Sequence, residues 1–475
     1  MTPARSHVES QVVWMAALDA LCLLIAVVCG ITVRLGAESL REYFYDNVYG
    51  WVYFAGSIII ANYVVGSYGM EIRVSRFNVF VNWLFSIAVA LLVVSVTSYA
   101  WLNVYVGRGV LGLALAVYSV LWLALRFLLY QLLFRREYFA YRVAVIGTGP
   151  LAESLIAVVQ NPLIRPVHHV VAVIDLIDGA PRGSGPSAAG CGTVPVTSSS
   201  REGLTDAVRR LAANVVLLAV KDEETLREVY VRLRRLRFEG LGVLSALGAM
   251  ELYTGRIPLD LIDDQWLWQA SGGVGALTVM RFKRIVDLLL VILTLPLTVP
   301  LAVLVAAVVK LSAPRDPVFY SQQRVGRFGR AFTMYKFRTM VTGAESKAGP
   351  MWSPPGDRRI TAAGGFLRRY RLDELAQLVN VLRGDMSLVG PRPERPEIAA
   401  ELEQQILYYR ERENVPPGLT GWAQIRHPYG GSVADSRIKV EYDLYYIQNL
   451  SFGLDLRIIL RTLRIVLLGM EREMR

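Results

Sequence analysis

Long apolar runs separated by short polar loops fill the first 135 residues of the chain. They cover residues 12–33, 50–66, 79–102 and 110–134. Each run is close to the ~20 apolar residues that a spanning helix needs, and the second is the shortest. Arg73 and Arg76 follow the second run, and Arg135 and Arg136 follow the fourth. By the positive-inside rule, residues 1–137 are predicted to form a four-transmembrane-helix bundle that starts and ends in the cytoplasm.

Two ionisable residues, Asp19 and Arg126, fall inside these apolar runs. A charged side chain within a membrane segment is costly, and it usually faces a partner or a water-filled cavity. We expect either a paired acid and base with a structural role or a polar functional site, and the pattern leaves both interpretations open.

Strand-like and helical stretches alternate between residues 138 and 250. Strands are predicted at residues 141–148, 168–175, 214–220 and 241–247. This alternation predicts a Rossmann-like parallel α/β domain on the cytoplasmic side. Residues 178–200 are rich in Gly, Pro, Ser and Ala, so they are predicted to form a mobile loop.

The first predicted strand of this domain runs into Gly147-x-Gly149-x-x-Ala152 and then a helix. Gly147 and Gly149 would let a pyrophosphate approach the helix amino terminus. However, Ala152 replaces the third glycine of that pattern, and Asp175 lies farther along than the usual ribose-binding acid. The domain is therefore either a nucleotide-binding domain or a structural or regulatory one.

A fifth apolar segment, residues 285–309, contains Asp287 as its one charged residue. Its length would cross a ~30 Å hydrocarbon core. Pro296 and Pro300 interrupt it, and proline inside a helix breaks or kinks the helix. Basic residues flank both ends, so the positive-inside rule asks for two cytoplasmic ends. We predict a re-entrant helix over 283–310 that breaks at Pro296; the alternative is a spanning helix with a proline kink.

A basic amphipathic pattern ends the chain. Arg457, Arg461 and Arg464 recur at helical spacing among Ile, Leu and Val within residues 455–468. This is typical of a helix that lies in the lipid headgroup plane, although an ordinary core-packing helix gives the same pattern.

Cations dominate the segment after the fifth apolar run. They are Lys310, Arg315, Arg324, Arg327, Arg330, Lys336 and Arg338, with Asp316 as the acid among them. A solvated basic face is the ordinary interpretation of such a run. Here glycines and aromatic residues are interleaved with the cations, which favours strands and turns that present the cations to an anion.

Two adjacent carboxylates, Asp373 and Glu374, follow within an apolar pattern of helical period over residues 367–383. On one helix Gln377 and Asn380 share the face of Asp373, and Glu374 is displaced by ~100°. The two acids could therefore take different roles, one attacking phosphorus and the other holding Mg²⁺. An exposed surface pair is the ordinary alternative for two acids on a helix.

Five strings in this part of the chain stand in the order KRIVDLLL, RVGRFGRAFTMYKFRTM, LDELAQLVNVLRGDMSLVGPRPE, PGLTGWAQ and YDLYYIQNLSFGLDLRII. By these strings, the chain from about residue 281 to its end resembles the monotopic phosphoglycosyl transferases of bacteria. The apolar runs and the α/β domain in front resemble the long form of that family, whose members often transfer galactose or glucose phosphate to undecaprenyl phosphate. The resemblance implies a mostly helical, monotopic catalytic domain over 280–475, behind a linker over 251–279.

The resemblance also implies a ping-pong mechanism. Asp373 would attack the sugar-linked phosphorus of a UDP-sugar and release UMP, and undecaprenyl phosphate would then take the sugar phosphate from the aspartate. Glu374 would bind the Mg²⁺ cofactor. Lys336 and Arg392 would hold phosphate oxygens, with Arg392 fixed between two prolines.

Further substrate contacts implied by the resemblance are Arg324, Arg338, Gln424 and Asp455. For Asp455, capping of the final helix is the alternative. The chain departs from the family pattern at Leu295, Ala376 and Pro416. These positions put in doubt the angle of the helix break and one nucleotide or phosphate contact, whereas Ala376 is expected to be tolerated.

Composition fits this picture. The net charge is +11, with 53% hydrophobic and 19% charged residues, which is typical of a membrane protein rather than a nucleic-acid-binding one. The resemblance to the long form of the family further implies a homodimer, and we expect it in the bacterial inner membrane with its catalytic domain on the cytoplasmic face. A membrane-anchored nucleotide-sugar dehydratase would need a second dinucleotide fold with Tyr-x-x-x-Lys, and a non-catalytic assembly scaffold would not need the acids and cations above.

Overall fold

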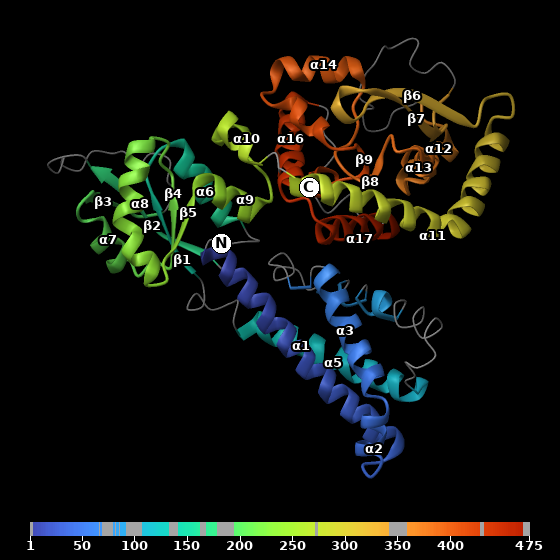
Figure 1. Ribbon diagram of the computed structural model, residues 1–475, viewed down its shortest axis with the longest axis horizontal. Coiled ribbons are helices and arrows are strands. Elements are labelled where there is room, and N and C mark those ends of the chain that lie inside the picture. The colour runs from blue at the N-terminus through green and yellow to red at the C-terminus, as the bar shows by residue number, and fades with distance from the viewer. Residues whose placement is uncertain are drawn as a thin grey trace. The chain divides into compact units, whose positions relative to one another are not determined.

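The computed structural model divides into two compact units, Met1–Thr254 and Gly255–Arg475 (Figure 1). It describes residues 3–65, 67–68, 79–80, 82–84, 86–91, 107–132, 141–161, 168–177, 194–270, 274–341, 359–427 and 432–468. The chain combines apolar helices with a parallel α/β domain, as the sequence predicts, and each part is described separately below.

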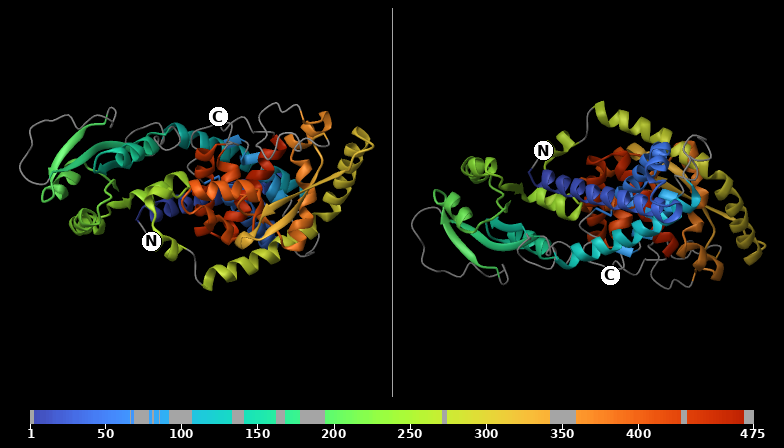
Figure 2. Two further views of the ribbon diagram at one scale, coloured as in Figure 1. Left: turned by 90° about the horizontal axis from the view of Figure 1, so that it is seen from above. Right: turned by 90° about the horizontal axis from the view of Figure 1, so that it is seen from below.

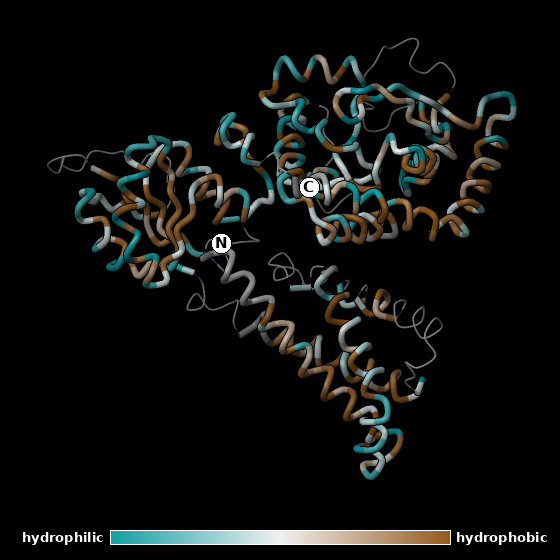
Figure 3. Tube along the Cα trace, in the orientation of Figure 1, coloured by the Kyte–Doolittle hydropathy of each residue, from teal (hydrophilic) through white to brown (hydrophobic). Residues whose placement is uncertain are grey.

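Apolar helices pack around a common core in the amino-terminal part of the first unit. They are α1 (Pro3–Leu35), α3 (Val48–Val65) and α5 (Arg108–Leu132), with the short α2 (Leu40–Asp46) after α1. Val79 and Ala90 of the third predicted run join this core, although much of that run lies outside the described residues. Hydrophobic residues extend along α1, α3 and α5 (Figure 3).

Three of the described helices are long and apolar enough to cross a membrane: Val13–Leu35, Arg108–Leu128 and Thr278–Ser312. The first two correspond to the first and fourth predicted runs, and the third contains the fifth apolar segment. The arrangement of four spanning helices stays a prediction.

Asp19 and Arg126 face each other inside the helical core, as one interpretation of the sequence expected. Their side chains pair at 3.0 Å and are 0% and 5% exposed. Asn62, Tyr68 and Trp122 also donate hydrogen bonds to the Asp19 carboxylate, at 2.9–3.2 Å. A buried carboxylate with this many donors has its hydrogen-bonding capacity filled.

Five parallel strands form the sheet of the α/β domain, in the order β3-β2-β1-β4-β5. They are β1 (Tyr141–Ile146), β2 (His168–Ile177), β3 (Val196–Ser200), β4 (Val215–Leu218) and β5 (Gly242–Ser245). The helices are α6 (Pro150–Gln160), α7 (Leu204–Arg210), α8 (Glu223–Phe238) and α9 (Ala246–Thr254). α7 and α8 share a core with alternate residues of the central strands, and α6 packs against α9.

One strand of this sheet was not predicted. Residues Val196–Ser200 pair with β2 as the edge strand β3, so the prediction of a loop over 178–200 is wrong at its end. Residues 178–193 of that prediction lie outside the described residues. The Ser-rich sequence has little intrinsic preference for a strand, and pairing with the edge of β2 provides its backbone partners.

The sheet accounts for the first glycine of the predicted nucleotide loop. Gly147 has φ +103°, and a Cβ added there would lie 2.7 Å from the carbonyl oxygen of Ala219. Its N–H donates to the carbonyl of Ile174. Glycine is therefore required here by the close approach of two chain segments, and nucleotide binding at Gly147 and Gly149 stays a prediction.

The second unit contains a long apolar helix, α11 (Val274–Ser312), with Pro296 and Pro300 in its interior. The ribbon is continuous but changes direction along its length (Figures 1 and 2). Each proline removes a backbone donor and crowds the preceding turn, which accounts for the bend. Leu293 and Leu297, near the bend, are 76% and 73% exposed, so their apolar side chains are largely uncovered.

Around α11 the second unit is built from short helices and two small sheets. β6 (Phe319–Val325) and β7 (Ala331–Phe337) form an antiparallel hairpin, and β8 (Ser387–Val389) pairs in parallel with β9 (Gly418–Thr420). The helical elements are α10 (Asp264–Ala270), α12 (Ala362–Arg369), α13 (Leu378–Arg383), α14 (Pro396–Gln405), α15 (Trp422–Arg426), α16 (Val433–Gln448) and α17 (Phe452–Leu468), with 3-10 turns η3 (Leu259–Leu261), η4 (Arg327–Gly329), η5 (Leu372–Gln377) and η6 (Tyr409–Asn414).

The first residues of the second unit contact α15 and α16. Ile257 donates its N–H to the carbonyl of Glu441, whose carboxylate pairs with Arg256 at 3.5 Å. The Trp422 indole N–H donates to the carbonyl of Gly255 at 2.7 Å. Residues 255–257, within the segment expected to be a linker, thus form part of the second compact unit.

Candidate active site

The two acidic residues lie on a 3-10 turn rather than on one long helix. α12 ends at Arg369, and Arg371 adopts a left-handed conformation with φ +52° before η5 begins. The prediction of a continuous helix over 367–383 is therefore wrong. A left-handed arginine is strained, and such strain persists where the surrounding structure imposes it, often at functional sites. The reversal at Arg371 turns Asp373 and Glu374 inward, where they are 6% and 7% exposed.

Three cations surround the carboxylate of Glu374. Arg392 approaches Oε1 at 3.0 Å, Lys336 approaches the same oxygen at 3.4 Å, and Arg371 approaches Oε2 at 3.6 Å. Burial alone would raise the pKa of Glu374, but these cations hold it well below its usual range. Glu374 is therefore ionised, and it organises cations from β7, from the residue before η5 and from the segment after β8.

Asp373 lies beside this group of charges. Burial raises its pKa, although the Lys336 ammonium opposes the shift. In the described part of the chain no hydrogen bond or close ion pair engages its carboxylate, which distinguishes it from Glu374. Burial also lowers the pKa of Lys336. One of the two acids is thus held by cations, and the other has no such partner among the described residues.

Asn380 fixes the elements that carry these groups. Its side-chain amide donates to the carbonyl of Thr333 at 2.7 Å and accepts from the N–H of Tyr335 at 3.2 Å. α13 is thereby stapled to β7, the strand that carries Lys336. The arrangement of Lys336 and Glu374 follows from this staple.

Arg392 projects from a Pro391-Arg392-Pro393 elbow that follows β8. The elbow is packed closely on β9, because a Cβ on Gly418 would lie 2.0 Å from the backbone nitrogen of Gly390. Arg324, on β6, donates to the carbonyl of Pro393 at 3.3 Å and lies 3.7 Å from the Glu394 carboxylate. The predicted substrate residue Arg324 therefore contacts the elbow, next to the residue that reaches Glu374.

Other predicted site residues lie elsewhere in the second unit. Arg338 pairs with Asp316 at 2.7 Å and donates to the carbonyl of Pro317. Asp455 pairs with Lys283 of α11 at 2.5 Å and accepts from the Tyr446 hydroxyl at 2.8 Å. The structure thus brings Asp373, Glu374, Lys336 and Arg392 together and turns Arg338 and Asp455 toward other partners.

A residue other than Asp455 makes the capping contact at the start of α17. At the start of α17 the Ser451 hydroxyl accepts the N–H of Leu454 at 3.3 Å, so Ser451 makes the capping contact. Gln424 on α15 has both side-chain amide atoms buried, and neither has a hydrogen-bond partner among the described residues. Such an amide is available to a ligand.

Two residues of the site were missed from the sequence. Arg371 stands within the Arg-rich string before the acids, but its contact with Glu374 depends on a backbone reversal that helical periodicity does not predict. Gln377 was assigned to a polar face; it is 3% exposed, and its amide nitrogen is buried without a partner among the described residues. Its position four residues after Asp373 was the available signal.

The oxygen donors at this site suit Mg²⁺ only in part. No three acidic, histidine or cysteine side chains gather as a metal cage in the described ranges. Mg²⁺ commonly takes one or two carboxylates and completes its coordination with substrate phosphates and water. Asp373 and Glu374 fit that mode, since the contacts of Glu374 leave carboxylate lone pairs available.

Comparison with known proteins identifies similar chains. The family model described as bacterial sugar transferase matches residues 278–469. A UDP-N-acetylgalactosamine-undecaprenyl-phosphate N-acetylgalactosaminephosphotransferase of Aeromonas hydrophila is 37% identical over 257 residues, which cover 54% of this chain and 59% of that protein. A UDP-glucose:undecaprenyl-phosphate glucose-1-phosphate transferase of Xanthomonas campestris pv. campestris is 38% identical over 220 residues, 43% of this chain and 45% of that protein.

A shorter relative is covered almost completely. The uncharacterized sugar transferase EpsL of Bacillus subtilis (strain 168) is 42% identical over 194 residues, 40% of this chain and 89% of that protein. The chain matches about half the length of the first two relatives. The stretch that matches EpsL is short enough to fit within the second compact unit.

Proposed function

The chain belongs to the bacterial sugar transferase family, and from that membership we propose that it transfers a hexose-1-phosphate from a UDP-sugar to undecaprenyl phosphate with release of UMP. The product would be the first lipid-linked intermediate of an exopolysaccharide, capsule or O-antigen. The names of the relatives support this class of reaction. The observation that carries it is the unengaged Asp373 carboxylate beside Glu374 and its cations.

In this mechanism Asp373 attacks the phosphorus that bears the sugar. A bond forms between the aspartate oxygen and this phosphorus, and the bond from phosphorus to the bridging oxygen breaks, so that UMP leaves. A phosphate oxygen of undecaprenyl phosphate then attacks the same phosphorus. This second attack frees the aspartate and yields undecaprenyl-diphosphate-sugar.

The surrounding cations bind the diphosphate. Lys336 and Arg392 approach the site from two elements, and their charges would neutralise phosphate oxygens as negative charge builds on the leaving UMP. Glu374 holds both side chains in position before the substrate arrives. Arg324 steadies the elbow that carries Arg392, and Gln424 offers an amide to the nucleotide or sugar.

Glu374 would hold Mg²⁺. When bound, the ion supplies charge neutralisation for the diphosphate and assists the departure of UMP. One carboxylate is enough for this use, because the phosphates of the substrate would complete the coordination.

The membrane arrangement proposed here places four spanning helices before the α/β domain and makes α11 a re-entrant helix. Its support is the exposed apolar surface of α11, the bend at its prolines and the basic residues at both ends. This topology keeps the active site of the second unit on the cytoplasmic face of the inner membrane, where UDP-sugars occur. By analogy with long-form relatives we also propose a homodimer.

A cysteine introduced near Arg315 tests the re-entrant topology. It should be shielded from an impermeant thiol reagent in intact cells, whereas a cysteine at Ala37, in the first external loop of the proposed topology, should react. Labelling near Arg315 from outside would mean that α11 crosses the membrane.

The activity itself is tested by UMP release. The full chain, in lipid with undecaprenyl phosphate and Mg²⁺, is assayed against UDP-glucose, UDP-galactose and their N-acetylated forms. We expect UMP release with at least one donor and a radiolabelled sugar-phosphoryl protein when the lipid acceptor is omitted. Asp373→Asn should abolish both signals, and full turnover by that variant would rule out Asp373 as the nucleophile.

A further inference from the structure

We infer that Arg412 is a positioning residue that fixes the phosphate-binding elbow by holding the carbonyl oxygen of Arg392. The inference rests on the proposed function, because it assigns the elbow to the binding of the sugar-nucleotide diphosphate. Arg412 lies on η6, outside the strings that indicated the site. It touches neither acid, so its influence on them passes through Arg392.

Each nitrogen of the Arg412 guanidinium donates a hydrogen bond. Nη2 donates to the carbonyl of Arg392 at 2.9 Å, Nε donates to Asp443 at 3.0 Å, and Nη1 donates to the Tyr409 hydroxyl at 3.1 Å. The side chains of Arg412 and Asp443 are 8% and 2% exposed. Two elements thus hold Arg412 in a single orientation, with Asp443 provided by α16.

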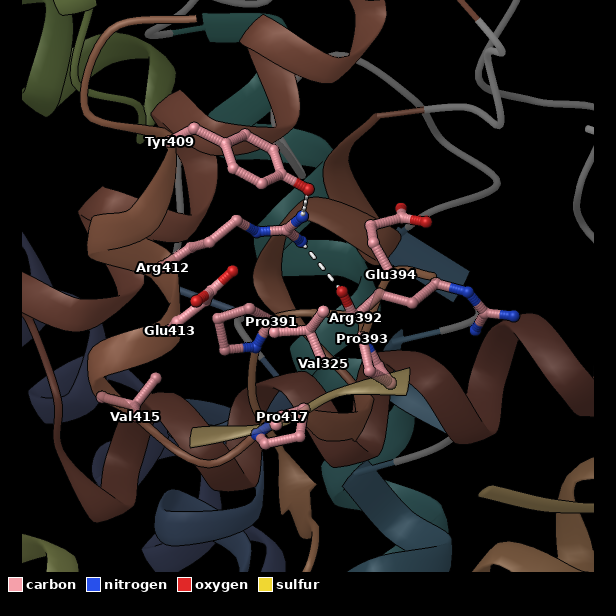
Figure 4. A pocket seen from close by; sticks show the side chains of 11 residues that line it. Val325, Pro391, Arg392, Pro393, Glu394, Tyr409, Arg412, Glu413, Val415 and Pro417 are labelled. Carbon is pink, nitrogen blue, oxygen red and sulfur yellow. Dashed lines mark hydrogen bonds between the residues drawn. The ribbon is translucent and has the colours of Figure 1, made fainter. Parts of the chain in front are cut away.

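Figure 4 shows how this group meets the elbow. Arg412 lies between Tyr409 and the backbone of the elbow, and the Arg392 guanidinium extends away from it. A cavity of about 20 Å³, lined by Pro391, Arg392 and Arg412 among others, lies beside the elbow. It has room for about one water molecule.

Holding this carbonyl matters because of the flanking prolines. Pro391 and Pro393 fix their own φ angles, and proline at 393 also restricts the residue before it to extended conformations. The orientation of the peptide between Arg392 and Pro393 is then set by what its carbonyl contacts. Through that peptide Arg412 sets the direction in which the Arg392 side chain leaves the backbone toward Glu374.

A purely structural pair is the competing interpretation. Replacing a buried ion pair by apolar residues often costs a fold nothing, so the pair by itself is weak grounds for a stabilising role. The contact with Arg392 predicts something that a stabilising role does not: substitution of Arg412 should matter only while Arg392 is present.

A double-mutant cycle tests this prediction. Arg412→Lys keeps a positive charge opposite Asp443 but loses the planar fork. In the full chain in lipid we expect Arg412→Lys to weaken UDP binding and to raise KM for the UDP-sugar by roughly tenfold. In an Arg392→Gln background the same substitution should change either quantity by less than about twofold. Equal losses in both backgrounds, or no loss beside a wild-type Arg392, would overturn the inference.

Two controls separate the alternatives. Arg437, on the helix that carries Asp443, pairs with Asp260 of η3, and Arg437→Gln should leave UDP binding unchanged. If Arg412→Lys does not fold, Asp443→Asn replaces it in the cycle. A loss of UDP binding only beside wild-type Arg392 would then support the inference, and equal losses in both backgrounds, or no loss, would overturn it. Amide exchange at Gly390, Arg392 and Glu394 should rise in the Arg412 variant, and unchanged exchange there would overturn the inference even if the chain turned over no UDP-sugar. Absence of UMP release by the wild-type chain with raised exchange in the variant would instead reject the proposed function alone.

Discussion

The Asp19 cluster and the Glu374 cluster both bury a carboxylate against arginine, and they differ in their balance of charge. In the helical core Asp19 faces one arginine, and neutral donors fill its remaining positions. In the candidate active site Glu374 is approached by Lys336, Arg371 and Arg392, while Asp373 stays unengaged among the described residues. The first cluster is neutral, and the second holds more cations than acids.

Exposure differs in the same sense. Arg126 is 5% exposed, whereas the side chains of Arg371 and Arg392 are 29% and 36% exposed. A closed cluster whose charges balance offers no net charge to an anion, so it is suited to orienting helices. A partly open cluster with excess positive charge attracts an anion. Burial of charge therefore does not identify a functional site; the unmatched charge and the access to solvent do.

The largest effect is expected for Glu374→Gln. The amide keeps the size of the side chain but no longer balances the three cations or offers a charged ligand to Mg²⁺. UMP release should fall by about 10³-fold, with the thermal unfolding of the second unit close to that of the wild type because solvent reaches the cations. A variant that retained a tenth of the activity would show that the two clusters do not differ in function.

Asp19→Asn should give the opposite result. It leaves the Arg126 charge buried without its carboxylate, which should lower the free energy of unfolding of the helical core by about 3 kcal/mol. Thermal or denaturant unfolding in detergent measures this loss. The double variant Asp19→Asn with Arg126→Gln should recover part of it, and the turnover of correctly folded protein should match the wild type. A large fall in turnover without loss of stability would give this cluster a functional role.

A smaller change is expected at Arg371. Its contact with Glu374, at 3.6 Å, is the longest of the three, and its backbone is strained. Arg371→Gly removes the cation but accepts the left-handed conformation. KM for the UDP-sugar should rise about fivefold with kcat nearly unchanged, since a surface-accessible cation contributes about 1 kcal/mol. If Arg371→Gly were as damaging as Arg392→Gln, the open side of the cluster would extend farther than the distances indicate.

Much of this architecture follows from periodicity. Strands β1, β2, β4 and β5, the described apolar helices and, as one of two interpretations, the pairing of Asp19 with Arg126 were indicated by the positions of apolar and charged residues. Those features depend on local pattern and on the cost of burying charge, which the sequence states directly. The grouping of Asp373, Glu374, Lys336 and Arg392 in the structure agrees with the resemblance of the strings that contain them.

What escaped prediction depends on contacts between distant segments. The reversal at Arg371 occurs in a sequence of good helical character, because packing of η5 against β7 overrides propensity. β3 forms from serines because an open edge of β2 is available. Arg338, two residues after Lys336, would share its face on an extended strand, yet β7 ends at Phe337 and Arg338 turns to Asp316. Single-residue periodicity carries none of this information.

The part of α11 before Pro296 contacts the elements that carry the candidate active site. Arg284 donates to the carbonyls of Val381 and Leu382 at the end of α13, and Asp287 accepts from Ser387 of β8 at 2.6 Å. Hydrogen bonds thus join the apolar helix to α13, which follows the two acids, and to β8, which precedes the elbow. A thinner or thicker bilayer would tilt this part of α11, and the tilt would move α13 and β8 with it. The thickness of the surrounding lipid would therefore alter the positions of the active-site residues.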